Sequence, residues 1–313
     1  MAIQQPAALA VKEKKIRILL AGPPGIGKTT LALSAPNPLL IDVDRGLDRV
    51  TAIHRKTFIQ PANYEELMED LVVENITSYD TLVFDTGGQL IKLMAAWAIR
   101  QDKKNGKRDG SLSLPGYGAV GREFERLINY CYYTFNKHIV VVFHSKEDKD
   151  GEDTRLRLLV EGQTKDNVWQ PMDLGGFIEI QGNKRTIGLS NCERYYAKGT
   201  HGINGIISIP ELKDGVKNDF LTNLFAQVNK NIAQEAIEVE AIMTKYDAVM
   251  EEAMNIIEDI NTPEEATAAI EKMKKLQHSL TSEKEIKAVF AAKIKAMGYI
   301  YDSKKGIYIS KAS

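Results

Sequence analysis

Apolar residues in the first half of the chain come in short, uninterrupted runs. Residues 16–21, 38–43, 81–85 and 139–143 are nearly all apolar and have the length of β-strands. Polar stretches with a helical spacing of apolar positions separate these runs, so helices are expected between them. Strands this uniformly apolar that alternate with helices predict a parallel sheet covered on both faces.

Three of the intervening helices have recognisable sequence signals. Asn63, followed three residues later by Glu66, has the form of a capping box and predicts a helix through about Asn75. A second helix is expected over 88–102. A third precedes the run at 139–143, with one apolar face formed by Phe124, Leu127, Ile128 and Cys131.

The pattern changes after Thr154. The segments RLRLLVEG, GFIEIQG and KRTIGLS look like short strands joined by tight turns such as Gly182–Asn183. They predict an antiparallel extension at the edge of the same sheet.

Helix-forming residues dominate after Asn229. One apolar stripe contains Ile242, Tyr246, Val249 and Ala253, and two further helix starts are indicated by Thr262-Pro263-Glu264-Glu265 and by Ser282 with Glu285. The last residues, YIYDSKKGIYI, alternate around a glycine turn. We therefore expect a core domain at 12–230 and a helical C-terminal domain at 231–313 that ends in a short hairpin.

Composition restricts the class of protein. The 313 residues are 43% hydrophobic and 27% charged, as in soluble globular proteins, and 41 Lys and Arg nearly balance 42 Asp and Glu. No global basic field would drive the chain onto nucleic acid or a membrane. Cys131 and Cys192 match neither a zinc spacing nor a disulfide framework. With no apolar run of spanning length and no signal-peptide pattern, a cytoplasmic protein without a membrane partner is expected.

The strongest chemical signal lies between the first predicted strand and the helix that follows it. Residues 22–29, GPPGIGKT, fit the phosphate-loop pattern G-x-x-x-x-G-K-[ST] in its expected strand–loop–helix context. Consecutive backbone N–H groups of such a loop bind the phosphates of a nucleotide, and side chains at the three glycines would obstruct them. The residues predicted to bind ATP are Gly22, Pro23, Pro24, Gly25, Ile26, Gly27, Lys28, Thr29 and Thr30.

A metal-bound triphosphate needs further polar groups. Lys28 is expected on the β- and γ-phosphates, while the Thr29 hydroxyl and Asp85, at the end of the 81–85 strand, are expected to support Mg²⁺. The alternative for Asp85 is an N-cap of the next helix, and Thr86 is a secondary candidate. Asp42 and Asp44, at the end of the second strand, are both placed to activate water.

The strings LLIDVDRGLDRV, GPPGIGKTT and TLVFDTGG together resemble RecA-like ATPases, in particular phage nucleotide-binding proteins that include single-strand annealing recombinases. The resemblance covers the core only. It implies an α/β, RecA-like P-loop fold with a mostly parallel sheet, in which Asp44 takes the place of the catalytic acid. If the chain is phage-encoded, it would act in the host cytoplasm.

Two further residues are assigned with the help of this resemblance. His144 follows the 139–143 strand and is expected at the carboxyl edge of the sheet, where it would sense the γ-phosphate. Lys198, in YAKG, resembles the basic residue that such proteins present to ATP on a neighbouring subunit, with Arg194 as its substitute. A homo-oligomer is therefore expected, although ordinary structural roles for both residues stay open.

Nucleic acid is expected at one basic segment. Arg100, Lys103, Lys104, Lys107 and Arg108 fall in a glycine-containing stretch that reads as a mobile loop, and Tyr117 could supply a stacking face. The alternative is a solvated loop. The tyrosines at the C-terminus could stack on bases but more often pack in their own domain. The C-terminal helices, with a slight excess of acids, point to a protein partner or to packing.

The function expected from these observations is an ATPase that acts on single-stranded DNA in phage recombination or annealing. Two alternatives remain: a kinase for a nucleotide or other small molecule, and a nucleotide-gated protein-interaction module in which hydrolysis is slow or absent.

Overall fold

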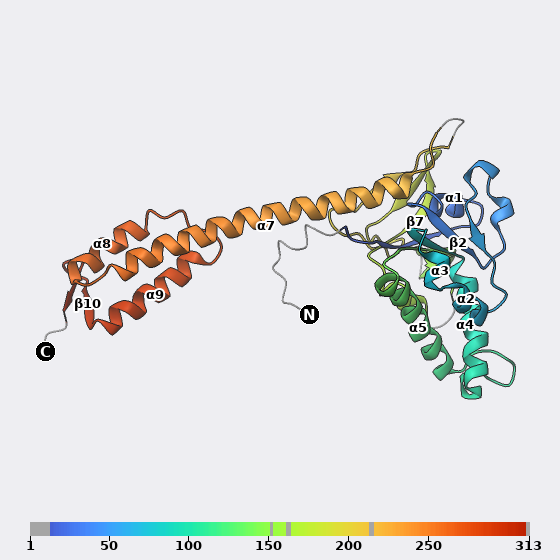
Figure 1. Ribbon diagram of the computed structural model, residues 1–313, viewed down its shortest axis with the longest axis horizontal. Helices are drawn as coiled ribbons and strands as arrows, with labels where there is room; N and C mark the ends of the chain where they lie inside the picture. The colour runs from blue at the N-terminus through green and yellow to red at the C-terminus, as the bar shows by residue number, and fades with distance from the viewer. Residues whose placement is uncertain (1–12, 151–152, 161–163, 213–215, 311–313) are drawn as a thin grey trace. The chain divides into compact units, whose positions relative to one another are not determined.

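The computed structural model describes residues 13–150, 153–160, 164–212 and 216–310 (Figure 1). It divides into two compact units, Glu13–Asn231 and Ile232–Ser313, and each is described by itself.

The first unit is built on a mixed sheet in the order β3-β2-β4-β5-β1-β7-β8-β9. Its six parallel strands are β1 (Arg17–Gly22), β2 (Pro38–Asp42), β3 (Phe58–Ile59), β4 (Thr81–Asp85), β5 (His138–Asp150) and β7 (Leu174–Gln181). Two antiparallel strands follow at one edge, β8 (Lys184–Gly188) and β9 (Ile206–Ser208). The phosphate-loop strand β1 lies between β5 and β7, and β5 separates it from β4. The phosphate loop thus follows a central strand of a mostly parallel sheet, as predicted.

Helices connect these strands. They are α1 (Lys28–Ala32), α2 (Tyr64–Asp70), α3 (Val73–Ile76), α4 (Gly87–Gln101), α5 (Leu114–Asn129) and α6 (Thr164–Asn167), with 3₁₀ turns at Leu47–Arg49, Ala52–His54 and Lys103–Asn105 and a π-helical turn at Tyr130–Thr134. The predicted helix at 88–102 is therefore confirmed within a residue at each end.

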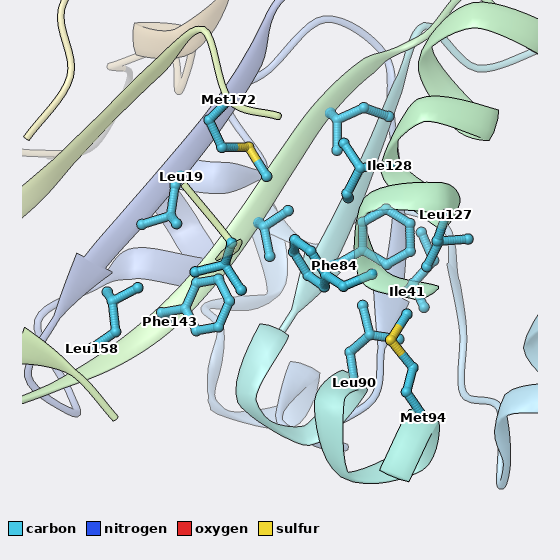
Figure 2. Packing of buried hydrophobic residues seen from close by; sticks show 14 of the residues in the cluster. Leu19, Ile41, Phe84, Leu90, Met94, Leu127, Ile128, Phe143, Leu158 and Met172 are labelled. Atoms are coloured by element: carbon cyan, nitrogen blue, oxygen red, sulfur yellow. The ribbon is translucent and has the colours of Figure 1, made fainter. Parts of the chain in front are cut away.

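Both faces of the central parallel strands β1, β2, β4 and the first part of β5 are buried, as their uniform apolar sequences predict. On one face, Phe84 and Phe143 from neighbouring strands lie against the apolar sides of α4 and α5 (Figure 2). The alternating positions of the same strands, such as Val83 and Val140, lie on the other face and are fully buried. There the ring of Phe225 stacks on His138 with 4.8 Å between centroids.

The helix predicted from Asn63 to about Asn75 is broken. The Asn63 side chain caps α2 by accepting the Glu66 N–H at 2.9 Å, but α2 ends at Asp70 and the chain turns before α3. Val72 and Val73 are β-branched and disfavour a continuous helix, and the Asn75 side chain donates to the Asp70 carbonyl at 3.0 Å. The break was not predicted because the apolar spacing continues through it.

The region after Thr154 is only partly an antiparallel edge. β6 (Asp153–Leu158) pairs with the distal half of β5, whereas β7 runs parallel to β1 and belongs to the central sheet. The prediction was wrong for β7 because the chain crosses through α6 before it returns to β1. The turn between β7 and β8 is confirmed: Gly182 and Asn183 have φ values of 52° and 66°, as a tight hairpin with right-handed twist requires.

Helix α7 (Phe220–Glu258) begins inside the first unit and continues into the second, where α8 (Pro263–Met273), α9 (Ser282–Ala296) and the hairpin β10 (Tyr299–Asp302) and β11 (Ile307–Ser310) follow. The second unit has its own apolar cluster, which includes Ala253, Ile257 and Phe290. In the apolar stripe that the sequence predicts along this helix, Val249 and Ala253 are buried while Ile242 is exposed.

The two predicted helix starts in this unit have different outcomes. Thr262 and Glu265 form the capping box of α8, as predicted. Ser282 was predicted as an N-cap, but it is the first residue of α9, and Thr281 occupies the cap position. The Ser282 hydroxyl instead accepts the Ser279 N–H of the preceding turn at 3.0 Å. Serine side chains often bond to nearby backbone groups in this way.

Even the 39-residue α7 lacks an apolar stretch that could cross a membrane, and the other helices in the described ranges lack one too.

Candidate nucleotide site

The phosphate loop connects the carboxyl end of β1 to the first turn of α1. Gly25 and Gly27 have φ values of 79° and 90°, in the left-handed region that glycine adopts at little cost. This backbone conformation allows successive N–H groups to point toward one ligand, beside the N-terminus of the following helix. The nine loop residues predicted from sequence, Gly22 to Thr30, therefore lie together at the sheet edge.

Lys28 folds back over this loop. It is 5% exposed, and its Nζ donates to the Pro23 carbonyl at 2.7 Å. Burial lowers the pKa of Lys28 to about 8, and the nearby carboxylates Asp85 and Asp44 oppose that change. A partly desolvated ammonium close to these acids would bind an anionic phosphate strongly, because the negative charge would favour its protonated form.

Thr29 and Asp85 meet across the sheet edge. The Thr29 hydroxyl donates to Asp85 Oδ2, and Asp85 is 6% exposed. Burial raises the pKa of Asp85 to about 6, supported by nearby Asp42 and Asp44 and opposed by the Thr29 hydrogen bond and by Lys28. The alternative N-cap role for Asp85 is wrong, since the Thr86 side chain caps α4 by accepting the Gln89 N–H.

These two side chains suit Mg²⁺. That ion prefers oxygen ligands and usually takes one or two from the protein, completing its shell with phosphates and water. In the parts of the chain that the structure describes, no group of three or more His, Cys, Asp or Glu could hold a metal by itself. A metal held by Thr29 and Asp85 would take its other ligands from phosphate oxygens and water.

Asp42 and Asp44 have different environments. The buried Asp42 carboxylate accepts bonds from Gly46 N, Leu47 N and Gln60 Nε2 at 2.9, 3.2 and 2.8 Å. It therefore holds the loop after β2 and is not free to activate water, contrary to the expectation that both acids compete for this role. The Asp44 side chain is 26% exposed and pairs with Arg49 at 3.0 Å.

His144 lies opposite Gly22 in the register between β5 and β1. The position is half-buried, and burial, together with nearby Lys28 and Arg49, lowers the pKa of the imidazole, while Asp44 opposes this effect. Its buried Nδ1 has no hydrogen-bond partner among the described residues. Lys28, Thr29, Asp44, Asp85 and His144 therefore meet at one sheet edge.

Comparison with known proteins agrees with this geometry. A protein-family model described as an AAA domain matches residues 14–201, which is more than half of the chain. The chain belongs to this AAA-domain family.

Two other comparisons are less informative. No curated protein matches the sequence. Among solved structures, the flagellar accessory protein FlaH from Methanocaldococcus jannaschii is similar, with 12% sequence identity, coverage of 63% of this chain and 90% of FlaH, and a TM-score of 0.22.

Lys198 and Arg194, the two predicted cations, are both held by other groups of this AAA domain. Lys198 forms a β-bridge with Gly175, which pairs with Leu19 near the start of β1, and its Nζ donates to the Met172 carbonyl. Arg194 pairs with Glu179 at 3.1 Å and lines one pocket together with Pro23 and Ile26 of the phosphate loop. The predicted action of Lys198 on a neighbouring subunit stays a prediction.

The basic segment of the AAA domain is more ordered than a mobile loop. Arg100 belongs to the last turn of α4 and pairs with Glu65 at 2.7 Å, and Lys103–Asn105 form a 3₁₀ turn. Tyr117 lies in α5 and is partly buried against the core, and its role as a stacking face stays a prediction. Arg100 is exposed, as are Lys103, Lys104, Lys107 and Arg108.

Sequence reasoning missed two arginines close to the site. Arg49 is the ion-pair partner of Asp44, and Arg185 of β8 lies against the phosphate loop, with Nη1 at 3.5 Å from the Ile26 carbonyl. Arg49 could have been found from its place in the predicted loop after the second strand. No local signal pointed to Arg185, because the contact joins residues 159 positions apart.

Proposed function

We propose that this AAA domain binds ATP with Mg²⁺ and hydrolyses it. The observation that carries the proposal is the meeting of Lys28 and Thr29 from the phosphate loop with the buried Asp85 carboxylate from β4. A strand-end acid beside the loop threonine is the arrangement that a metal-bound triphosphate requires.

In this proposal each side chain has a distinct task. Loop N–H groups and Lys28 bind the phosphates, and Thr29 and Asp85 support Mg²⁺, which would neutralise charge on the phosphate oxygens. The Asp44 carboxylate orients and deprotonates the attacking water, for which it must leave its ion pair with Arg49. Burial lowers the pKa of His144 and so favours its neutral form, and its buried Nδ1, which has no partner among the described residues, is available for a hydrogen bond with the γ-phosphate end of the ligand.

We further propose that hydrolysis is coupled to single-stranded DNA, as in the RecA-like phage proteins that the sequence resembles. Four exposed cations within Lys103–Arg108 support this assignment, because clustered Lys and Arg neutralise phosphates. The homo-oligomer with Lys198 acting on a neighbouring subunit, a protein partner for the C-terminal helices and a cytoplasmic location belong to the same proposal.

The first experiment tests nucleotide binding. Titration of the full chain with ATP and Mg²⁺ should show saturable binding, and Lys28→Ala should weaken it by about 10- to 100-fold, because a hydrogen bond to a charged group contributes about 1.5–3 kcal/mol. Lys92→Ala, an exposed lysine on α4, is the matched control and should bind as the wild type does. Absence of ATP binding by the wild type would refute the proposal.

The second experiment tests turnover and the role of DNA. Steady-state release of phosphate should fall by about 10²- to 10⁴-fold in Asp44→Asn, the usual contribution of a general base. Single-stranded DNA should raise the wild-type rate. Transfer of phosphate from ATP to a nucleotide or other small molecule, without release of free phosphate, would favour the kinase alternative. If Asp44→Asn no longer hydrolyses ATP but keeps the biological function of the protein, the nucleotide-gated interaction module is favoured. A rate of ATP hydrolysis that does not change with DNA would refute the coupling to DNA.

A further inference from the structure

Arg49 is a permanent cation beside the residues assigned to ATP hydrolysis, and its Nη2 donates to Asp44 Oδ2 at 3.0 Å. This ion pair lies next to the end of β4, because the Asp44 N–H donates to the Asp85 carbonyl at 3.1 Å. Burial and Lys28 lower the pKa of His144, while Asp44 opposes that change and Arg49 adds to it. The ion pair therefore lies within electrostatic reach of the imidazole that is assigned to the γ-phosphate.

The backbone that carries Arg49 is held independently of this ion pair. The Asp42 carboxylate accepts the N–H groups of Gly46 and Leu47 at 2.9 and 3.2 Å, and Leu47 is buried. Leu47 begins the 3₁₀ turn that ends at Arg49, whose own N–H donates to the Gly46 carbonyl at 3.1 Å. Beyond this anchored turn the Arg49 side chain is 66% exposed. A rotation of the side chain alone can therefore move the guanidinium to another partner.

Electrostatics favours such a move when a triphosphate is bound. Exposed ion pairs contribute little, because water screens the two charges and the side chains lose rotational freedom. A terminal phosphate carries more negative charge than a carboxylate, and a guanidinium can donate two parallel hydrogen bonds to it. A γ-phosphate beside Asp44 would therefore compete successfully for Arg49. A diphosphate has no group at this position, so the ion pair with Asp44 would persist.

The same exchange changes the base. A carboxylate paired with a cation is a poor proton acceptor, because the cation stabilises its ionised form, and the guanidinium also occupies one of its oxygens. Departure of Arg49 leaves the Asp44 carboxylate able to accept a proton from water. After hydrolysis and loss of the γ-phosphate, the guanidinium returns to Asp44.

We propose that Arg49 distinguishes ATP from ADP: it pairs with Asp44 when no γ-phosphate is bound, and it moves to the γ-phosphate of bound ATP, which releases Asp44 for the attacking water. The inference rests on the proposed binding and hydrolysis of ATP and deepens it. It assigns to one side chain both the preference for the triphosphate and the release of the base.

Binding of two nucleotides tests the contact with the γ-phosphate. ADP and the β,γ-imido analogue of ATP, which keeps a terminal phosphate but resists hydrolysis, are titrated with Mg²⁺ into the wild-type full chain and into Arg49→Gln. The variant should bind the analogue about 10- to 100-fold more weakly, as expected for loss of a hydrogen bond between charged groups, and should bind ADP within about twofold of the wild type. Arg45→Gln, an exposed arginine of the same loop, is the matched control and should alter neither affinity.

A double-mutant cycle tests the exchange of partners. If Arg49 must leave Asp44 to reach the phosphate, Asp44→Ala removes the competing partner. This substitution should then tighten binding of the analogue more in the presence of Arg49 than in the Arg49→Gln background. The expected difference is about 1.5- to 5-fold, the contribution of an exposed ion pair.

Other outcomes would overturn the inference. An equal loss of affinity for both nucleotides in Arg49→Gln would mean that Arg49 only supports the loop after β2, and no loss for the analogue would remove it from the site. Additive effects in the cycle would refute the exchange. Tryptophan fluorescence checks that each variant is folded. If Arg49→Gln fails to fold, Arg49→Lys keeps the charge without the planar group and should still lose affinity for the analogue alone. A wild type that binds neither nucleotide would refute the proposed function itself.

Discussion

At the scale of single residues, burial decides which polar groups carry chemistry and which hold the fold. His138 is an example of the second kind. It is 1% exposed at the start of β5, its Nδ1 accepts the Ile16 N–H at 2.9 Å, and its ring stacks on Phe225. Burial, with a smaller contribution from Lys15, lowers the pKa of His138 to about 3.

This shift predicts a pH dependence of stability. Between pH 6.5 and about 3 the unfolded chain binds a proton at this histidine while the folded protein does not, so acid lowers the free energy of unfolding. At pH 5 the loss from His138 should be about 2 kcal/mol relative to pH 7.5. His138→Gln keeps an acceptor for Ile16 and should lose correspondingly less stability on acidification.

Urea denaturation at pH 7.5 and pH 5.0 measures this difference. Trp97 and Trp169, the two tryptophans of the chain, both lie in the first unit and report its unfolding by fluorescence. His54→Gln, a histidine substitution elsewhere in that unit, should show the wild-type loss. The same loss in His138→Gln as in the wild type would contradict the assignment.

At the scale of elements, local sequence signals specify where several helices begin. At the start of α8, Thr262 Oγ1 accepts the Glu265 N–H at 3.2 Å, and the Glu265 carboxylate accepts the N–H groups of Thr262 and Asn261 at 3.0 and 2.7 Å. Pro263 occupies the first helical position, where a missing N–H costs nothing. These bonds satisfy donors that the helix itself cannot pair.

Removing the cap should therefore weaken α8. Thr262→Ala is expected to lower the free energy of local opening by about 1 kcal/mol, the usual contribution of an N-cap side chain. Hydrogen exchange of the α8 amides measures this change. The control Thr244→Ala, within α7, should not reduce the protection of the α8 amides. Unchanged protection of these amides in Thr262→Ala would show that packing alone determines the stability of α8.

At the scale of the whole molecule, the apolar residues form separate clusters in the two units. Leu19, Phe84 and Phe124 belong to the cluster of the first unit, and Ala253, Ile257 and Phe290 to that of the second. The proposed nucleotide site lies entirely in the first unit. A ligand that binds only the folded form stabilises the unit whose folding creates the site.

ATP with Mg²⁺ at about 100 times its Kd should therefore raise the free energy of unfolding of the first unit by about 2.7 kcal/mol. The expected effect on the α8 and α9 amides of the second unit is nil. Tryptophan fluorescence follows the first unit and hydrogen exchange the second, with Lys28→Ala as the variant that should not respond. Equal stabilisation of both units would show that they unfold together.

Short-range information in the sequence was sufficient to predict many of the local structures of this protein. The apolar runs predict β1, β2, β4 and the start of β5, and the spacing of glycines with Lys28 and Thr29 predicts the phosphate loop. The capping box at Thr262 and the turn at Gly182–Asn183 are likewise encoded within a few residues. Each of these features depends on backbone preferences or side-chain periodicity over one element, so the printed sequence determines them.

The tertiary structure alone decided the environments of the site residues and the order of the strands. Asp42 and Asp44 look equivalent in sequence, but three donors hold Asp42 while Asp44 reaches the site beside Arg49. The parallel course of β7 likewise follows from pairing with β1. It is this pairing of distant strands that brings Arg185 against the phosphate loop. Local pattern cannot specify such contacts, because they depend on the order of strands in the sheet and on which side chains remain unpaired when the core closes.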